Sequence, residues 1–201
     1  MQLKLFGKVV QVLVASRPDS KASIQMGVIE VIRGQGVEND RHAGQSRRVD
    51  VRESAMLEFG FSKGVEIVNH RQFSAISEEE LGEITNALGL AAVPYGCLSE
   101  NLVIRGIPKF SQLPIGTMLF FHRPDGQARS AVLVVWDENK PCRLPGEEIQ
   151  KHFPNVDDVA QRFARAAINR RGIVGTVYCS GTIHQGDQVI AILPSRITQF
   201  P

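Results

Sequence analysis

The sequence predicts a mainly β fold, a closed antiparallel barrel with a few helical insertions. Short β-branched and aliphatic runs separated by glycine and proline dominate the chain, and only two stretches have clear helical periodicity. The strands do not alternate regularly with helices, which disfavours a parallel sheet. Apolar residues make up 43% of the 201 residues, enough for a core. No repeat or linker divides them, so we expect one domain over residues 1–201.

The first half of the chain begins with two predicted strands. Residues 3–14 are β-branched and aliphatic, and residues 24–32 alternate apolar and polar side chains. The segment G-Q-G-V-E-N-D-R-H-A-G at 34–44 is rich in glycine and charge, and such loops often carry ligands. Two short strands are predicted to follow, at 65–68 and 72–77.

The first predicted helix starts at Ser77. Glu80 lies three residues on, which is the spacing of a capping box. Gly89 suits the left-handed position after a helix end. One helical face is apolar, formed by Leu81, Ile84 and Leu88.

The second half of the chain returns to strands. The segment N-L-V-I-R-G at 101–106 is strand-like, and P-D-G-Q predicts a hairpin turn between strands at 114–121 and 128–136. A loop at 138–146 and a helical turn or two at 147–153 are expected next. A second helix is predicted over 155–171, with an apolar face of Val159, Phe163, Ala166 and Ala167. The segment 173–192 is predicted to form strands around a turn at Ser180-Gly181.

Bulk charge and cysteine content favour a cytoplasmic protein. The net charge of +2 does not indicate nucleic-acid binding, and no apolar run has the length of a membrane span. The N-terminus mixes charged and apolar residues too early for a signal peptide. Three cysteines without metal-type pairing do not form a disulfide framework. We expect neither a nucleic acid nor a membrane as partner.

The three cysteines are predicted to differ in role. Cys179 shares a strand face with apolar residues, and Cys97 lies in a turn before a strand, so both are expected to be packed. Cys142 lies in E-N-K-P-C-R-L-P-G, where two prolines restrict the backbone. Lys140 and Arg143 favour its thiolate, the form that acts as nucleophile or metal ligand. A loop cysteine with charged neighbours is the plain alternative.

Two further site chemistries remain open on residue types alone. A histidine base could serve Cys142, with His152, His42 and His184 as candidates, and Asp40 and His42 could join Cys142 in a zinc site. The sequence spacing of these residues specifies neither the histidine base nor the zinc site. Arginines also surround the loops, and if these loops meet, they form a basic mouth suited to phosphate. The alternative is solvated surface charge. These arginines are Arg41, Arg47, Arg48, Arg71, Arg170 and Arg171.

Five ordered motifs resemble the MOSC domain, named after the C-terminal domain of molybdenum cofactor sulfurases. They are G-V-E-N-D-R-H-A-G (36–44), S-E-N-L-V-I-R-G-I (99–107), L-P-I-G-T (113–117), K-P-C-R (140–143) and R-G-I-V-G-T-V-Y…G-T-I-H-Q-G-D (171–187). The similarity spans about 9–192. The segment S-K-G-V-E-I-V-N-H-R-Q-F-S-A-I-S-E-E-E also resembles a bacterial subgroup of small stand-alone MOSC proteins.

The resemblance implies a barrel of the pyruvate-kinase-barrel type that binds a molybdopterin-type cofactor. The family's cysteine falls on Cys142, which would be the catalytic residue and the metal ligand, and soft thiolate ligation of a transition metal is chemically reasonable. Pyridoxal phosphate is mentioned for the family, but no separate signature for it is present. The implied cofactor-binding residues are Asp40, Arg41, His42, Arg71, Asn101, Lys140, Arg143, Arg171 and Gly172.

Two positions depart from the family pattern. Asn39 and Ser99 stand where glycine is usual, and asparagine tolerates the left-handed conformation better than most residues. In these 201 residues we expect no cysteine-desulfurase domain. We therefore expect any sulfur to come from a partner.

Four functions follow as expectations. Cys142 would carry sulfur to the molybdenum cofactor, or would remain a ligand while the metal reduces N-hydroxylated compounds. Alternatively the protein would be a non-catalytic module that delivers cofactor. A cysteine hydrolase is the least favoured reading. The expected partners are the small-molecule cofactor or an N-hydroxylated substrate, with a cysteine desulfurase or a redox protein.

Overall fold

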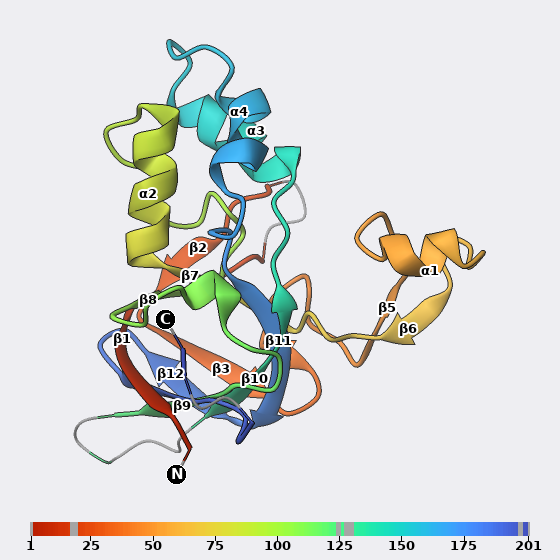
Figure 1. The fold of residues 1–201 in the computed structure, drawn as a ribbon, viewed down its shortest axis with the longest axis vertical. Coiled ribbons are helices and arrows are strands. Elements are labelled where there is room, and N and C mark those ends of the chain that lie inside the picture. The colour runs from red at the N-terminus through yellow and green to blue at the C-terminus, as the bar shows by residue number, and fades with distance from the viewer. Residues whose placement is uncertain (1, 17–19, 124–125, 127–130, 197–198, 201) are drawn as a thin grey trace.

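A closed β-barrel forms the centre of the molecule in the computed structural model, which describes residues 2–16, 20–123, 126, 131–196 and 199–200 (Figure 1). Its strands neighbour one another in the order β1-β13-β9-β10-β11-β7-β8, and β8 pairs again with β1. The predicted mainly β barrel is confirmed. These strands are β1 (Lys4–Val14), β7 (Phe73–Ser77), β8 (Leu102–Arg105), β9 (Met118–His122), β10 (Val132–Glu138), β11 (Ile173–Cys179) and β13 (Gln188–Ile192).

The length of β1 allows the barrel to close. Its first half, Lys4–Lys8, pairs with β13, and its last three residues pair on with β2 (Ile24–Met26). Its other edge pairs with β8. The barrel pairings are antiparallel except for the parallel pair β7–β8, whose connection contains a helix, as parallel strands require.

Two small sheets are separate from the closed sheet of the barrel. One joins β3 (Val28–Ile32), β4 (Gly36–Val37) and β12 (Gly181–His184). The predicted single strand at 24–32 is therefore wrong, because the chain leaves β1 at Gly27 and β3 pairs with β12 instead.

The other small sheet belongs to an arm, residues 46–68, that projects from the side of the barrel (Figure 1). The arm contains β5 (Ser46–Arg48), the short helix α1 (Ser54–Glu58) and β6 (Glu66–Val68). Neither β5 nor α1 was predicted, since this stretch is polar and has no clear periodicity.

Three helices form a cap at one end of the barrel (Figure 1). They are α2 (Glu78–Leu88), α3 (Arg143–His152) and α4 (Val159–Ala166), and a short 3₁₀ turn, η1 (Phe110–Gln112), lies beside β7. The predicted start and end of α2 are confirmed, since Ser77 Oγ accepts the Glu80 N–H at 3.3 Å and Gly89 has φ 70°. The capping box is only half formed, because the Glu80 carboxylate accepts from Ser111.

Both other helices differ from the prediction at their ends. The helix α4 begins at Val159, because Asp158 takes the left-handed φ of 57°, and it ends well before Arg171. The helix α3 begins at Arg143, although Pro145 and Gly146 suggested a loop. Proline is tolerated in the first turn of a helix, where its missing N–H has no intrahelical partner.

The apolar core has two parts. One fills the barrel, and the other lies between the barrel and the cap, where Leu13 of β1 and Ile76 of β7 pack with Ile84, Leu88 and Phe163. The predicted apolar faces of α2 and α4 point into this second part. The cap is thus packed on the barrel.

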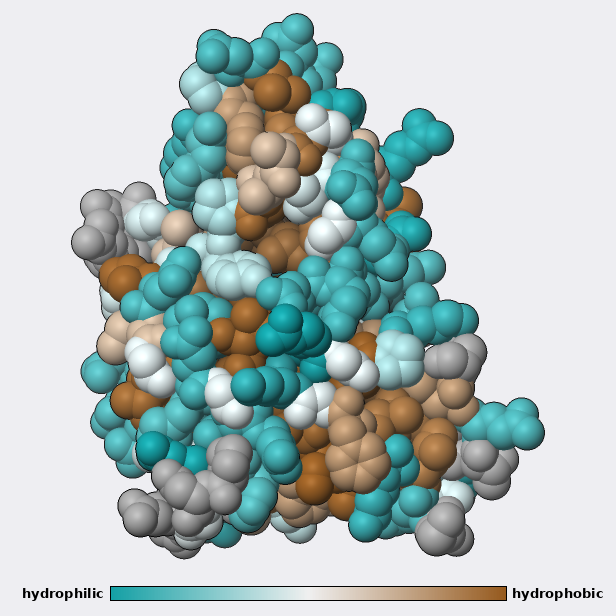
Figure 2. All heavy atoms as spheres, turned by 90° about the vertical axis from the view of Figure 1, so that its left-hand side faces the viewer, coloured by the Kyte–Doolittle hydropathy of each residue, from teal (hydrophilic) through white to brown (hydrophobic). Residues whose placement is uncertain are grey.

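Outward-facing apolar residues are scattered on the side shown in Figure 2, where hydrophilic side chains separate small apolar patches. Single exposed apolar residues of this kind are ordinary for a folded protein. The structure describes β9 and β10 on either side of the predicted P-D-G-Q hairpin, while residues 124–125 and 127–130 lie outside the described residues. No described helix is long and apolar enough to cross a membrane.

Candidate functional site

Cys142 stands at the start of α3 and not in the middle of a loop, as had been predicted for 138–146. Its backbone is extended, with φ −139° and ψ 176°, and its thiol is exposed. Asn139 anchors the approach to the helix, because its N–H donates to the Gly172 carbonyl at 2.8 Å and its Oδ1 accepts from Arg71 Nη2 at 2.8 Å. The barrel thus holds the chain that presents the cysteine.

Arg171, just before β11, is a buried cation with only 6% of its surface exposed. Burial lowers the pKa of its guanidinium, and the charges of Glu100 and of Cys142 oppose that shift. Its Nη2 donates to the Leu98 carbonyl, while its buried Nη1 has no hydrogen-bond partner in the described part of the chain. A buried donor of this kind is costly unless something accepts from it.

Glu100 supplies the buried negative charge near Arg171. Its Oε1 accepts the Gly96 N–H at 2.6 Å and its Oε2 accepts the Leu98 N–H at 3.0 Å. Burial raises the pKa of Glu100. These hydrogen bonds and the Arg171 charge lower that pKa and so oppose the effect of burial. Glu100 stands in the S-E-N-L-V-I-R-G-I motif, but the sequence argument selected only its neighbour Asn101 as a site residue.

Arg71 lies within electrostatic reach of three other arginines, and two of these, Arg52 and Arg171, also lie within electrostatic reach of Cys142. Burial lowers the pKa of Arg71 to about 10, and the positive charges of Arg52, Arg47 and Arg171 add to that effect. These side chains come from the arm, from the loop before β7 and from the loop before β11, so distant segments meet here. We call Arg47, Arg52, Arg71 and Arg171 the arginine cluster.

The arm brings Arg52 close to the cysteine. Arg52 Nε donates to Asp50 at 2.9 Å and 3.0 Å, and Arg52 chiefly holds the pKa of Asp50 at about 2. The Asp50 hydrogen bond raises the pKa of Arg52, and the charge of Cys142 raises it further. Arg47 forms an ion pair with Glu53 on the same arm. No sequence signal pointed to Arg52, since its role depends on the way the arm folds.

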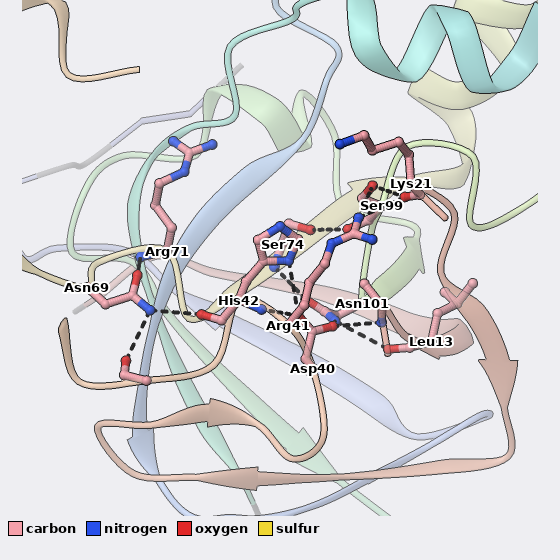
Figure 3. Close-up of polar contacts among 12 residues, drawn as sticks. Leu13, Lys21, Asp40, Arg41, His42, Asn69, Arg71, Ser74, Ser99 and Asn101 are labelled. Carbon is pink, nitrogen blue, oxygen red and sulfur yellow. Dashed lines mark hydrogen bonds and ion pairs between the residues drawn. The ribbon is translucent and has the colours of Figure 1, made fainter. Parts of the chain in front are cut away.

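The predicted residues Asp40 and Asn101 form a second, buried group (Figure 3). Asp40 Oδ2 accepts from Asn101 Nδ2 at 2.7 Å and from the Ala15 N–H at 2.8 Å. Its Oδ1 lies 2.8 Å from the His42 backbone nitrogen and 3.0 Å from His42 Nδ1. Asn101 Oδ1 accepts the Ser74 N–H at 2.9 Å. These contacts tie the loop at 34–44 to β1, β7 and β8.

The charge of Asp40 is stabilised by its partners. Burial by itself would raise its pKa, but the hydrogen bonds from His42 and from the Ala15 N–H outweigh burial and hold the pKa of Asp40 below its usual value. Both oxygens of this carboxylate are occupied, and only 6% of the residue is exposed. Asp40 therefore positions the loop that carries Arg41 and His42.

Asn69 connects the two groups. Its Nδ2 donates to the carbonyls of His42 at 2.9 Å and Gly44 at 3.0 Å, and its Oδ1 accepts the Arg71 N–H at 2.9 Å (Figure 3). The guanidinium of Arg71 extends away from Asp40 in this view, toward the side where Asn139 accepts from it. The loop at 34–44 and the arginine cluster are thus held in one arrangement.

Arg41 closes the other side of its loop. Its guanidinium donates to the carbonyls of Ser20 and Lys21 and to Ser99 Oγ, the last two at 2.9 Å and 3.0 Å (Figure 3). Ser99 has φ 57° and Asn39 has φ 60°. These are the two positions where the resemblance led us to expect glycine, and both adopt the left-handed conformation that glycine favours. The expected tolerance at Asn39 is confirmed.

The remaining predicted residues lie at the edges of the site. Lys140 is exposed beside Cys142, and Arg143 forms an i,i+4 ion pair with Glu147 on α3. Gly172 has φ 90°, and a Cβ there would clash with the Ala75 carbonyl oxygen. Only glycine suits position 172, next to Arg171, because of this positive φ and this close contact.

The other cysteine predictions had mixed outcomes. Cys97 is buried with 2% exposed, as expected, but Cys179 is exposed. The register between β10 and β11 shifts between the pairs Leu133–Val177 and Val132–Cys179. This bulge moves Cys179 off the inward face that simple alternation assigned to it.

The structure does not support the histidine or zinc alternatives. His152 ends the helix that Cys142 begins, about 15 Å away at the rise of an α-helix. His184 lies by Asp187 and Arg123, and His42 by Asp40. Across the described residues no histidine hydrogen-bonds Cys142, and no group of three or more His, Cys, Asp and Glu is placed to hold a metal ion.

The part of the chain that carries the site also matches a known protein family. The MOSC domain matches residues 40–190, a span that begins at the Asp40 loop and includes Cys142 and Arg171. The chain belongs to the MOSC family. YuaD of Bacillus subtilis (strain 168), whose name assigns it to metal–sulfur cluster biosynthesis, is 35% identical over 154 residues, which is 77% of this chain and 74% of YuaD.

Two solved structures agree with the fold. The crystal structure of YuaD superposes with a TM-score of 0.86 and 31% identity, covering 97% of this chain and 100% of that one. YiiM from Escherichia coli gives a TM-score of 0.51 at 15% identity, covering 96% and 72% of the two chains, so it supports the fold alone.

Proposed function

We propose that this MOSC protein binds a molybdopterin-type molybdenum cofactor with Cys142 as the protein ligand to the metal. The observation that carries the proposal is the exposed Cys142 thiol beside a buried arginine, Arg171, whose Nη1 has no partner in the described part of the chain. A thiol ligand next to cationic donors suits a soft metal held by an anionic organic group.

The arginine cluster fits the anionic parts of such a cofactor. Arg71 and Arg52 would bind its phosphate, because the N–H groups of a planar guanidinium donate to phosphate oxygens with matching geometry. Arg171 Nη1 would donate to an anionic oxygen and so gain the acceptor it lacks. Burial is the main cause of the lowered pKa of Arg71, and the positive charges of Arg52, Arg47 and Arg171 lower it further. A bound anion would offset these charges.

The chain's own residues orient the ligand. The contacts of Asn139 fix the start of α3, and hence the place where the Cys142 sulfur is presented. Asp40 and Asn69 hold the neighbouring loop in a matching position. When bound, the molybdenum would supply redox or sulfur-accepting chemistry that no side chain of this protein has.

A sulfur-carrier role is the second candidate. The exposure of Cys142 makes the thiol reachable by a partner protein, and the name of the relative YuaD refers to metal–sulfur cluster biosynthesis. In this role a desulfurase would load Cys142 as a persulfide, and its outer sulfur would pass to the acceptor while the Cys142 thiolate is released. A permanent ligand that supports reduction of N-hydroxylated compounds would not carry transferable sulfur.

The test is mass spectrometry of the released cofactor with metal quantification, on protein from a host that makes molybdenum cofactor. We expect molybdenum and pterin in near-equal molar amounts. Arg52→Gln should weaken cofactor retention about tenfold, as loss of one charge-assisted contact implies. Arg48→Gln, which changes an exposed arginine of the same arm, should retain it.

Two results decide the proposal. Wild-type protein without molybdenum and pterin, both as isolated and after reconstitution, would contradict cofactor binding. Persulfide labelling of Cys142 that disappears on transfer of sulfur would assign the carrier role, and its absence in cofactor-loaded protein would assign the permanent ligand.

A further inference from the structure

A hollow of about 1030 Å³ lies on the outer face of the barrel, beside the root of the arm. Its floor is formed by outward-facing residues of β10 and β11, among them Val134 and Thr176, which are paired in register. Its walls come from the loop after β3 and from residues 68–70, where the chain leaves the arm. We call this hollow the side groove. Its size is that of a small-molecule site.

One end of the side groove carries an aromatic platform. The rings of His70 and Trp136 are stacked, with centroids 3.7 Å apart and planes 14° from parallel. Trp136 remains 46% exposed, although it is a large aromatic residue. The β10–β11 register shifts between Val135 and Asp137, which leaves Trp136 unpaired at a bulge. Bulges often re-aim a side chain next to a site.

The other end of the side groove carries Tyr178, 58% exposed, and Arg33. The Arg33 backbone N–H donates to Ser180 Oγ at 2.8 Å, which fixes the loop, while its side chain makes no hydrogen bond or ion pair within the described residues. A cation thus borders this end, next to an exposed aromatic ring. Cys179 also lines this end of the groove.

The strand register sets the distance between the two ends. Trp136 lies two residues beyond Val134 on β10, and Tyr178 lies two residues beyond Thr176 on the antiparallel strand β11. Since these directions are opposite and each residue stands at a register shift, the two aromatic residues are about three paired steps, or about 10 Å, apart along the strands, at about 3.3 Å per residue. The groove therefore suits a ligand longer than one ring.

We propose that the side groove binds a planar heteroaromatic ring joined to an anionic group, as in a nucleoside monophosphate. The ring would stack on Trp136, and the anion would reach Arg33. A second aromatic residue, Tyr178, would contact the middle or the far part of the ligand. An apolar floor with a cation at one end selects for this combination over a purely apolar or a purely ionic molecule.

The Trp136 end of the side groove is the end nearer to the residues around Cys142. Asn69 and His70 border its Trp136 end, and Arg71, which contacts Asn139, follows them directly. The ring of a bound ligand would thus lie at the end nearest the arginine cluster. Any role of the bound ligand in a reaction at Cys142 would rest on the proposed function, whereas ligand binding in the groove does not.

Trp136 is the single tryptophan of the chain, so its fluorescence reports on this groove alone. The probe is guanosine 5′-monophosphate, titrated into protein without cofactor, with guanosine and inorganic phosphate as comparisons. We expect saturable quenching by the nucleotide, weaker quenching by guanosine and none by phosphate. Arg33→Gln should weaken nucleotide binding about tenfold and leave guanosine unchanged.

Matched variants keep the result interpretable. Arg165→Gln, at an exposed arginine of α4 in the cap, should bind the nucleotide like the wild type. Tyr178→Ala should weaken both nucleotide and nucleoside, and circular dichroism should show an unchanged fold, since Tyr178 is exposed. Calorimetry on Trp136→Ala should show loss of binding, independently of fluorescence.

The inference is overturned if quenching is linear with concentration, or if Arg33→Gln and Tyr178→Ala both bind the nucleotide like the wild type. Because the titration contains neither molybdenum nor pterin, its failure would leave the Cys142 proposal standing. Absence of molybdenum from the protein would likewise leave a positive titration standing.

Discussion

At the scale of single residues, Asp40 shows how a charged side chain becomes a structural element. Four contacts converge on its two oxygens, two of them from backbone N–H groups. The motif around Asp40 indicated a pocket residue, and the structure shows a buried carboxylate that holds the loop. Sequence could identify the residue, but its partners Ala15 and Asn101 lie far away in the chain and only the fold brings them together.

Asp40 should make the stability of the protein depend on acid pH. Its folded pKa is depressed, so its contribution is present above the unfolded pKa of about 3.9 and is lost as pH falls through the lower folded value. We expect Asp40→Asn to be less stable than the wild type at pH 7. The difference in unfolding free energy between the two should shrink as pH falls below about 4.

Urea unfolding at a series of pH values measures this difference. Asp157→Asn, which changes an exposed carboxylate before α4, should leave stability within about 0.5 kcal/mol of the wild type at each pH. A gap between wild type and Asp40→Asn that stays constant down to the lowest pH would show that the Asp40 charge does not stabilise the fold.

At the scale of elements, α3 presents Cys142 and packs closely against α4 at Gly146. A Cβ at Gly146 would lie 2.6 Å from Phe163 Cβ and 2.8 Å from the Ala160 carbonyl oxygen. Sequence reasoning took Pro145-Gly146 as a loop signal, because it could not detect a close helix contact that requires glycine. In this helix Gly146 allows close packing against α4 and does not form a turn.

Alanine at Gly146 should destabilise the protein, opposite to the usual effect of alanine in a helix. The clash with α4 should cost about 1–3 kcal/mol, more than the ~1 kcal/mol gained in helix propensity. Gly82→Ala in α2, where a Cβ meets nothing within 4 Å, should instead stabilise by about 0.5–1 kcal/mol. Denaturant midpoints compare the two, and a stabilised Gly146→Ala protein would contradict the close packing.

Strand prediction failed where tertiary pairing overrides a local pattern. Residues 24–32 alternate as one strand would, yet β2 continues the barrel edge of β1 and β3 joins β12. Cys179 lost its predicted inward orientation at a bulge. In both cases the deciding information is the partner strand, which a local window of sequence does not contain.

At the scale of the whole molecule, a barrel supports a cap and an arm beside the exposed thiol of Cys142. The barrel class, the α2 boundaries and the likeness to the MOSC family could be predicted, because they rest on local signals and on motif order. The arginine cluster could be predicted only in part, since Arg71 and Arg171 stood in motifs while Arg52 depends on the arm. Sequence likewise gave no indication of the side groove, whose walls meet only in the folded chain.

The measurement that tests the central claim most directly is the molybdenum content of Cys142→Ser. The wild type and Cys179→Ser, which changes the other exposed cysteine, serve as references. All three proteins are made in a host that produces the cofactor. We predict that the wild type and Cys179→Ser retain molybdenum and that Cys142→Ser loses it. Molybdenum retained by Cys142→Ser at the wild-type level would contradict the assignment of Cys142 as its ligand.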